Sequence, residues 1–228
     1  MDGVIVDSHP AHRSAWKEFL RTLGKELSDS ELDFIMDGRK REEILAHFLG
    51  PLDEAQLRNY GKMKNDLFSR AASDVAPIPG VFPFIDSLER EGIEMAVATS
   101  ASASRTRFTL KRMGLLHRFR AVVTGDEVPK GKPDPAIYQL ACKRLNCPPR
   151  AAVALEDAAS GVRAAKSAGV KCAAIADDTR RDLLLAAGAD AVLHDFVDIT
   201  PQVFRSLIGM NGSSIYRRGN ALASPLAE

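Results

Sequence analysis

Hydrophobic positions in the first third of the chain recur at helical spacing. Pro10 suits the first turn of a helix capped by Ser8 or His9, and apolar side chains then return every three or four residues. These side chains are Ala15, Trp16, Phe19, Leu20 and Leu23. The same character returns in the segments 29–36, 40–49 and 53–72. Because no alternating or β-branched run interrupts them, residues 9–78 are predicted to be all-helical.

From about residue 80 onward, short apolar runs alternate with helical segments. The apolar runs are 93–98, 121–123, 151–155, 170–176 and 191–193. The helical segments between them are 103–113, 135–145, 158–168 and 179–187. Continuous apolar strands that alternate with helices are typical of a parallel sheet covered by helices on both faces. The predicted fold class is therefore α/β, with a Rossmann-like parallel sheet core joined to an all-helical module.

The two ends of the chain differ from this pattern. The opening residues, MDGVIVDSHP, place Asp2 beside the apolar run 4–6, so that a carboxylate stands at the edge of a strand-like segment. That arrangement is typical of a catalytic loop, yet almost no chain precedes it. The stretch 211–228 has weak periodicity, and we expect it to be a flexible tail.

Composition excludes several classes of protein. The chain has 228 residues, a net charge of +1 and 45% hydrophobic residues, an ordinary balance for a globular protein without a strong field for nucleic acid or membranes. No apolar stretch approaches the roughly 18 residues that a membrane helix needs, and a signal-peptide pattern is missing. The cysteines form an odd set without metal-ligand spacing: Cys142, Cys147 and Cys172. We expect a cytoplasmic monomer that binds neither nucleic acid nor membranes.

Polar side chains follow three consecutive predicted strands. They are Thr99 and Ser100 after the first strand, Lys130 and Lys132 after the second, and Glu156 and Asp157 after the third. In parallel sheets ligands bind at the carboxyl ends of the strands, so these groups are expected to converge together with Asp2. Converging carboxylates favour Mg²⁺, and a lysine with a hydroxyl and backbone N–H groups favours phosphate. The combination predicts phosphoryl transfer, and the rival GxxxxGK[ST] phosphate loop is missing.

Each of these residues also has a purely structural interpretation. Thr99 and Ser100 could cap the helix that follows them, and Glu156 and Asp157 could cap the next helix along. Lys132 could be a solvated loop lysine. Their joint placement at the ends of consecutive strands favours the functional interpretation, because chance rarely repeats such a position.

Four motifs, in this order, resemble those of haloacid dehalogenase-like phosphatases. They are DGVIVDS at 2–8, ATS at 98–100, GKPDP at 131–135 and LEDAASG at 155–161. The resemblance implies Mg²⁺-dependent phosphoryl transfer through an aspartyl-phosphate. It also implies that residues 9–78 form a helical cap over a core made of 1–8 and 79–210. The expected partner is a small phosphorylated metabolite, namely a sugar phosphate.

The resemblance assigns roles residue by residue. Asp2 stands where the family has its general acid/base, whose backbone carbonyl also binds Mg²⁺. Thr99 and Lys132 stand where the transferring phosphoryl oxygens are stabilised, and Ser100 lies beside them in the phosphate site. The metal site is completed by Glu156 and Asp157.

Within the helical region, three patterns resemble β-phosphoglucomutase-like members. His12 belongs to a His-x-x-Ala-Trp pattern, Arg41 to a loop whose arginine holds the distal phosphate of the substrate, and Lys64 to a Lys-Asn-Asp element. His12 could instead pack or cap a helix, and Arg41 and Lys64 could be solvated. A mutase needs cap cations to hold a bisphosphate, but many phosphatases share this cap. Hydrolysis of a sugar phosphate is therefore placed first and a sugar phosphomutase second.

The first motif departs from the family pattern. That pattern is Asp-x-Asp-Gly, and Asp2 stands at its second aspartate, so the nucleophile and most of the first core strand would precede Met1. The first core strand is thus expected to be truncated. Either the start was set at an internal methionine, which we favour, or the chain is a catalytically inactive phosphate-binding relative, or Asp7 substitutes for the nucleophile.

Overall fold

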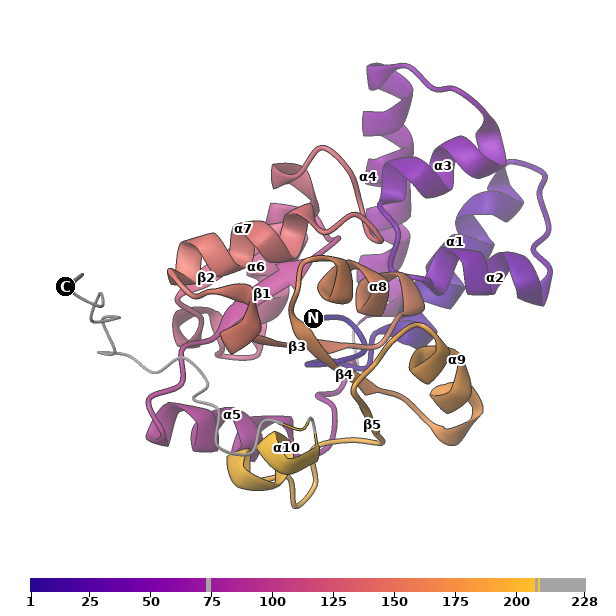
Figure 1. The fold of residues 1–228 in the computed structure, drawn as a ribbon. Coiled ribbons are helices and arrows are strands. Elements are labelled where there is room, and N and C mark those ends of the chain that lie inside the picture. The colour runs from indigo at the N-terminus through magenta and orange to yellow at the C-terminus, as the bar shows by residue number, and fades with distance from the viewer. Residues whose placement is uncertain (73–74, 208, 210–228) are drawn as a thin grey trace.

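The computed structural model describes residues 1–72, 75–207 and 209, and Figure 1 shows a layer of helices standing beside an α/β part. The helices of this layer are α1 (His9–Thr22), α2 (Asp29–Met36), α3 (Arg41–Leu49) and α4 (Glu54–Ala71). Their apolar faces meet in one buried cluster: Trp16, Phe19, Leu20, Ile35, Ile44 and Leu45. All four predicted helices are present, with ends within a residue or so of the expected positions. We call α1–α4 the helical layer.

The α/β part follows the predicted alternation of strands and helices. Its strands are β1 (Ala96–Thr99), β2 (Ala121–Thr124), β3 (Val153–Glu156), β4 (Lys171–Ile175) and β5 (Ala191–Leu193). Its helices are α5 (Val81–Arg90), α6 (Ala103–Arg112), α7 (Ala136–Leu145), α8 (Ala159–Ser167), α9 (Arg181–Ala186) and α10 (Pro201–Leu207). The α/β fold class is confirmed, whereas helix α10 had no counterpart in the sequence prediction.

The strands form two parallel sheets among the described residues. β1 pairs with β2, with Ala96 opposite Ala121, and the second sheet has the order β3-β4-β5. The sequence had suggested one sheet. Between β1 and β3 lies a mostly apolar cavity of about 200 Å³, lined by residues of both strands together with Met1 and helices α5 and α7. The facing edges of β1 and β3 therefore border a gap in which an extended segment would find backbone partners on both sides.

The opening residues form a turn, so the strand-like interpretation of 4–6 was wrong. Gly3 has a φ of +63°, a value that favours glycine, and its N–H donates to the carbonyl of Val6 at 2.8 Å. The chain then enters α1 with Pro10 in the first turn, as predicted. Ser8 occupies the N-cap position, but its hydroxyl does not cap the helix and donates to Asp2 instead.

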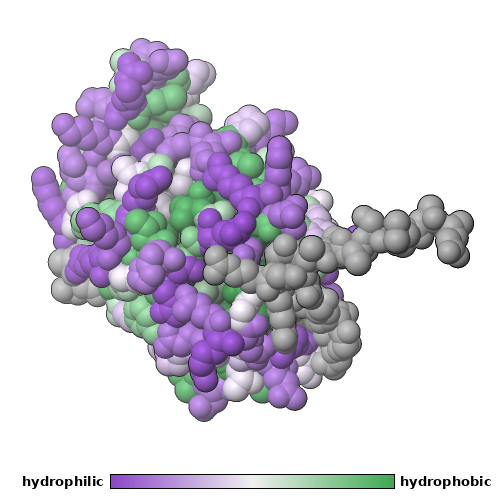
Figure 2. Space-filling model, turned by 90° about the vertical axis from the view of Figure 1, so that its left-hand side faces the viewer, coloured by the Kyte–Doolittle hydropathy of each residue, from purple (hydrophilic) through white to green (hydrophobic). Residues whose placement is uncertain are grey.

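Other features bear on the remaining expectations. The three cysteines are buried and free. Within the described residues, no helix is both long and apolar enough to cross a membrane. The face shown in Figure 2 is mostly hydrophilic, with hydrophobic residues gathered in small patches. The expected flexible tail at 211–228 lies outside the described residues, and the monomeric state stays a prediction.

Candidate active site

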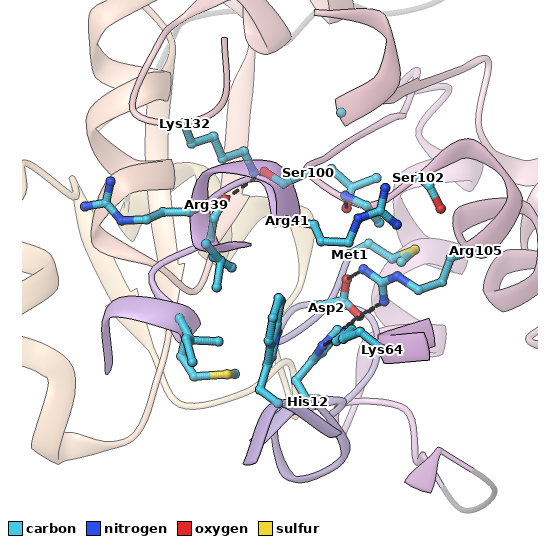
Figure 3. Close-up of a pocket in the computed structure, with 18 of the residues that line it drawn as sticks. Met1, Asp2, His12, Arg39, Arg41, Lys64, Ser100, Ser102, Arg105 and Lys132 are labelled. Atoms are coloured by element: carbon cyan, nitrogen blue, oxygen red, sulfur yellow. Dashed lines mark hydrogen bonds and ion pairs between the residues drawn. The ribbon is translucent and has the colours of Figure 1, made fainter. Parts of the chain in front are cut away.

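Of the residues proposed from the sequence, all but Lys130 line one cavity of about 140 Å³, between the helical layer and the α/β part (Figure 3), and Lys130 is exposed outside it. Those that line it are Asp2, His12, Arg41, Lys64, Thr99, Ser100, Lys132, Glu156 and Asp157. They come from segments spread over more than 150 residues of sequence. The strands explain this convergence, because Thr99 and Glu156 are the last residues of β1 and β3.

Thr99 and Ser100 do not cap the helix that follows them, so that structural interpretation was wrong. The N-cap of α6 is Ser102. Thr99 is buried, and its hydroxyl accepts the N–H of Ala101 at 3.2 Å, which turns the chain at the end of the strand. Ser100 donates its hydroxyl to the carbonyl of Gly38 at 2.7 Å, and it thereby joins β1 to the helical layer.

The loop around Gly38 is attached to the α/β part by further hydrogen bonds. The Lys40 ammonium donates to the carbonyl of Val128 at 2.6 Å, in the loop that leads to Lys132. The N–H of Ser160, in the first turn of α8, donates to the Asp37 carboxylate at 3.0 Å. These bonds hold the helical layer against the rim of the cavity.

Lys132 is buried and ion-paired, so it is not a solvated loop lysine. Its Nζ lies 2.5 Å from Oε1 of Glu156, and both side chains are almost fully shielded from solvent. Tyr138 of α7 donates its hydroxyl to the same carboxylate, a contact that the sequence prediction missed. Burial and the neighbouring Glu156 charge raise the pKa of Tyr138 well above its usual value, which keeps the phenol protonated as a donor. Since the N-cap of α8 is Ala158, Glu156 does not cap that helix.

Asp2 is held by an arginine that the sequence prediction also missed. Arg105 of α6 donates from Nη2 to Oδ2 at 2.7 Å and from Nη1 to Oδ1 at 2.9 Å, and Ser8 donates to Oδ1 at 2.6 Å. Burial alone would raise the pKa of the Asp2 carboxyl, but Arg105 and the hydrogen bond to His12 lower it well below its usual value. A first-turn position on the helix after β1 was the available signal for Arg105, because that end of the helix faces the strand ends.

His12 and Lys64 form a buried pair behind Asp2. The Lys64 Nζ lies 2.9 Å from Nδ1 of His12, and it also stands over the rings of Trp16 and Phe68. Burial and the Lys64 charge lower the pKa of His12 to about 3, so the imidazole is neutral near pH 7. Burial, followed by the charge of Arg105, lowers the pKa of Lys64 well below its usual value. Neither residue is solvated.

Two arginines with unpaired Nε donors line the other side of the cavity. Arg41 is the first residue of α3, and its guanidinium forms an ion pair with Glu42 at 2.8 Å. Arg39 lies over the ring of Phe34, and its Nη2 stands 3.6 Å from Asp37. The Nε atoms of both arginines are buried and find no hydrogen-bond partner among the described residues. A buried donor without a partner is costly, so Arg41 would gain from an acceptor in the cavity, whereas the guanidinium of Arg39 is directed at Phe34 and Asp37, which do not line the cavity.

The described residues supply only part of a metal site. Asp157 lies beside the backbone of Gly3, where an added Cβ would stand 2.3 Å from Oδ2, and His9 contacts that same oxygen at 2.7 Å. Within the described part of the chain, no group of three His, Cys, Asp or Glu side chains could hold a metal ion. One carboxylate with a neighbouring backbone carbonyl nevertheless fits Mg²⁺, which usually keeps waters and substrate oxygens among its ligands.

A parallel α/β core whose strand ends carry Thr99, Lys132 and Asp157, under a helical layer, defines a class of phosphoryl-transfer enzymes. The chain belongs to the haloacid dehalogenase-like hydrolase family, whose model matches residues 1–175. The resemblance of the four motifs to this family is thereby confirmed. The chain is thus an enzyme of the phosphatase and mutase type, and members of this family generally use a divalent metal.

Individual relatives indicate the kind of substrate that this class of enzyme uses. The chain is 36% identical to a phosphorylated carbohydrates phosphatase of Thermotoga maritima over 174 residues, which cover 75% of this chain and 80% of the relative. It is 29% identical to a β-phosphoglucomutase of Bacillus subtilis, with 88% and 89% covered. A crystal structure of CbbY from Rhodobacter sphaeroides with xylulose-(1,5)bisphosphate superimposes with a TM-score of 0.76, at 30% identity, over 87% of this chain and 92% of that one. These relatives support phosphoryl transfer with a phosphorylated carbohydrate as the class of reaction.

Proposed function

We propose that the protein hydrolyses a small sugar phosphate with the help of Mg²⁺, through an aspartyl-phosphate. The observation that carries this proposal is the convergence of Thr99, Lys132 and Asp157 with Asp2 around one cavity. A hydroxyl and an ammonium there would stabilise the charge on the transferring phosphoryl oxygens. The Ser100 hydroxyl, which now bonds Gly38, would join this phosphate site when the helical layer moves away.

Each charged residue has a role that follows from its contacts. Asp2, which Arg105 keeps ionised here, would take a proton from the attacking water, and it would protonate the leaving sugar oxygen only after Arg105 releases the carboxylate and Asp2 gains a proton from solvent. Asp157 and the backbone carbonyl of Asp2 would hold Mg²⁺, which supplies charge neutralisation at the phosphate. We assign to Glu156 the task of positioning Lys132, because its carboxylate is already engaged by that ammonium and by Tyr138.

The nucleophilic aspartate is proposed to lie directly before Met1, at the end of an extended segment. The gap between β1 and β3 supports this placement, because it is apolar, borders two strand edges and has Met1 in its lining. A strand in that gap would deliver its last side chain beside Lys132 and Asp157. Asp7 is a poor substitute, because it is exposed and does not line the cavity.

A sugar phosphomutase is the second candidate, and the cations of the helical layer favour it. Lys64 is buried with His12 as its neighbour, and Arg41 brings an unpaired Nε to the same cavity. A second phosphate on the substrate would satisfy both. Residues 9–78, which include helices α1–α4, would then act as the cap that holds a bisphosphate while it reorients.

The decisive experiment compares the 228-residue chain with a version extended by a five-residue apolar strand and an aspartate before Met1. Both are assayed with Mg²⁺ against a panel of sugar phosphates. The control is the same extended protein with asparagine in place of the added aspartate. We expect turnover from the aspartate version alone, and no phosphoenzyme from the other two. Equal activity of the asparagine version would show that the nucleophile lies elsewhere, and failure of all versions on every substrate would refute the enzymatic proposal.

A further inference from the structure

Arg41 lies in a notch on the neighbouring helix α4, and Gly61 makes that notch. A Cβ built on Gly61 would stand 2.7 Å from Cζ of Arg41, 2.9 Å from Nη1 and 3.0 Å from Nε. Real Cβ atoms essentially never approach a neighbour below 3.0 Å. The Arg41 guanidinium therefore occupies the space that any larger residue at position 61 would need.

The backbone itself gives no reason for a glycine at position 61. Gly61 lies inside α4 and is not among the residues with positive φ, so its conformation is open to every amino acid except proline. Glycine inside a helix costs about 1 kcal/mol relative to alanine. The close approach of Arg41 is the feature that explains this cost.

The notch also brings the charge of Arg41 close to Lys64. Gly61 precedes Lys64 by one helical turn, so the two positions lie on the same face of α4. The nearby Arg41 charge is one of the causes that lower the pKa of Lys64, after burial and Arg105. Two basic side chains, whose charged forms repel each other, are thus held close together beside a cavity, and the buried Nε of Arg41 has no acceptor among the described residues. An anion in the cavity would relieve this repulsion and satisfy the donor.

We propose that Gly61 is a positioning residue for substrate specificity: its missing side chain lets Arg41 point into the cavity and bind a second anionic group of the substrate. This inference rests on the proposed role of Arg41 toward such a group. A larger side chain at position 61 would push the flexible end of Arg41 aside and leave the fold intact. Selectivity for doubly phosphorylated sugars would fall, whereas the phosphate site at Thr99 and Lys132 would be untouched.

The test measures binding of fructose 1,6-bisphosphate and fructose 1-phosphate to the full chain by calorimetry, in the variants Gly61→Ala, Gly61→Leu and Arg41→Ala. We expect Arg41→Ala and Gly61→Leu to weaken bisphosphate binding about tenfold to hundredfold, the range of a lost charge-assisted hydrogen bond. Gly61→Ala should weaken it by a smaller factor. Monophosphate binding should stay within about twofold in all three variants.

Three controls separate positioning from a general structural effect. Gly61→Ala should keep or raise the melting temperature, because alanine favours the helix, so weaker binding would not reflect unfolding. In the Arg41→Ala background, Gly61→Ala should change nothing further, since its effect acts through that guanidinium. Met63→Ala, at an exposed position on the same helix, should leave both affinities unchanged.

The outcomes distinguish this inference from the proposed function. If Arg41→Ala loses bisphosphate selectivity but Gly61→Ala and Gly61→Leu keep it, Gly61 has no positioning role while the function of Arg41 stands. If Arg41→Ala has no effect on selectivity, or if the unaltered chain does not discriminate between the ligands, the second anion site itself is wrong. The positioning role of Gly61 and the anion-binding role of Arg41 then both fall, whereas hydrolysis of a monophosphate does not depend on them. If Gly61→Leu does not fold, the role of Gly61 is decided by Gly61→Ala alone. Its effect on bisphosphate binding is then compared between the unaltered chain and the Arg41→Ala background.

Discussion

The ion pair between Arg105 and Asp2 offers the sharpest test of how the site is built. Arg105→Met removes the guanidinium but keeps an unbranched side chain against Phe68. The side chains of Arg105 and Asp2 are 16% and 21% exposed, so the pair is largely buried. Breaking a fully buried pair lowers the free energy of unfolding by roughly 3–5 kcal/mol. Because this pair is partly exposed, we expect a loss of about 3 kcal/mol. For a chain of this size, that lowers the melting temperature by about 6–12 °C.

The pH dependence of this loss has a defined sign. In the unaltered chain the pKa of Asp2 is depressed, so its contribution to stability is present above the ordinary pKa near 4 and is lost as the pH falls through the depressed value. Without Arg105, we expect burial to outweigh the remaining contact with His12 and to raise the pKa of Asp2, so the variant should lose stability as the pH rises. The stability gap between the two proteins should therefore be largest near pH 7 and shrink toward pH 4.5. Urea unfolding at both pH values measures it.

A double-mutant cycle with Asp2→Asn isolates the pair itself. We expect a coupling free energy of about 2 kcal/mol between Asp2 and Arg105 at pH 7. Arg107→Met is the matched control, because Arg107 lies on the same helix but is exposed, and its loss should change stability by less than about 0.5 kcal/mol. A coupling below about 0.5 kcal/mol, or a gap that does not vary with pH, would refute this account of the site.

Two further variants probe the contacts around the cavity. Tyr138→Phe removes the hydroxyl that donates to the buried Glu156 carboxylate, and should lower the free energy of unfolding by about 1–3 kcal/mol in urea titrations; an unchanged midpoint would show that this bond contributes nothing. Ser100→Ala removes the bond to the Gly38 carbonyl, worth about 1 kcal/mol, and should speed amide hydrogen exchange in the loop 37–40 while helix α7 keeps its protection. Equal protection of that loop in both proteins would contradict the proposed attachment.

Local patterns in the sequence were sufficient for most elements. Helix α2 begins and ends where the apolar spacing predicted, and Ser28 and Glu31 form a capping box at its start. Strand β5 also matches its apolar run residue for residue. These elements depend on periodicity and on neighbours a few residues apart, which a sequence displays directly. The strand-end rule likewise placed Thr99, Lys132 and Asp157 around one cavity, because parallel strands end at a common edge.

Contacts between distant segments could not be predicted from such local patterns. Arg105 meets Asp2 across 103 positions of sequence, and Arg41 fits against Gly61 only because α3 and α4 pack together. Tyr138 of α7 likewise reaches Glu156, the last residue of β3, across 18 positions of sequence. Residue type and spacing thus determined the elements and the class of chemistry at their ends. The partner of each charged side chain was decided by packing, because which carboxylate a buried cation meets depends on the tertiary approach of two elements and not on either element alone.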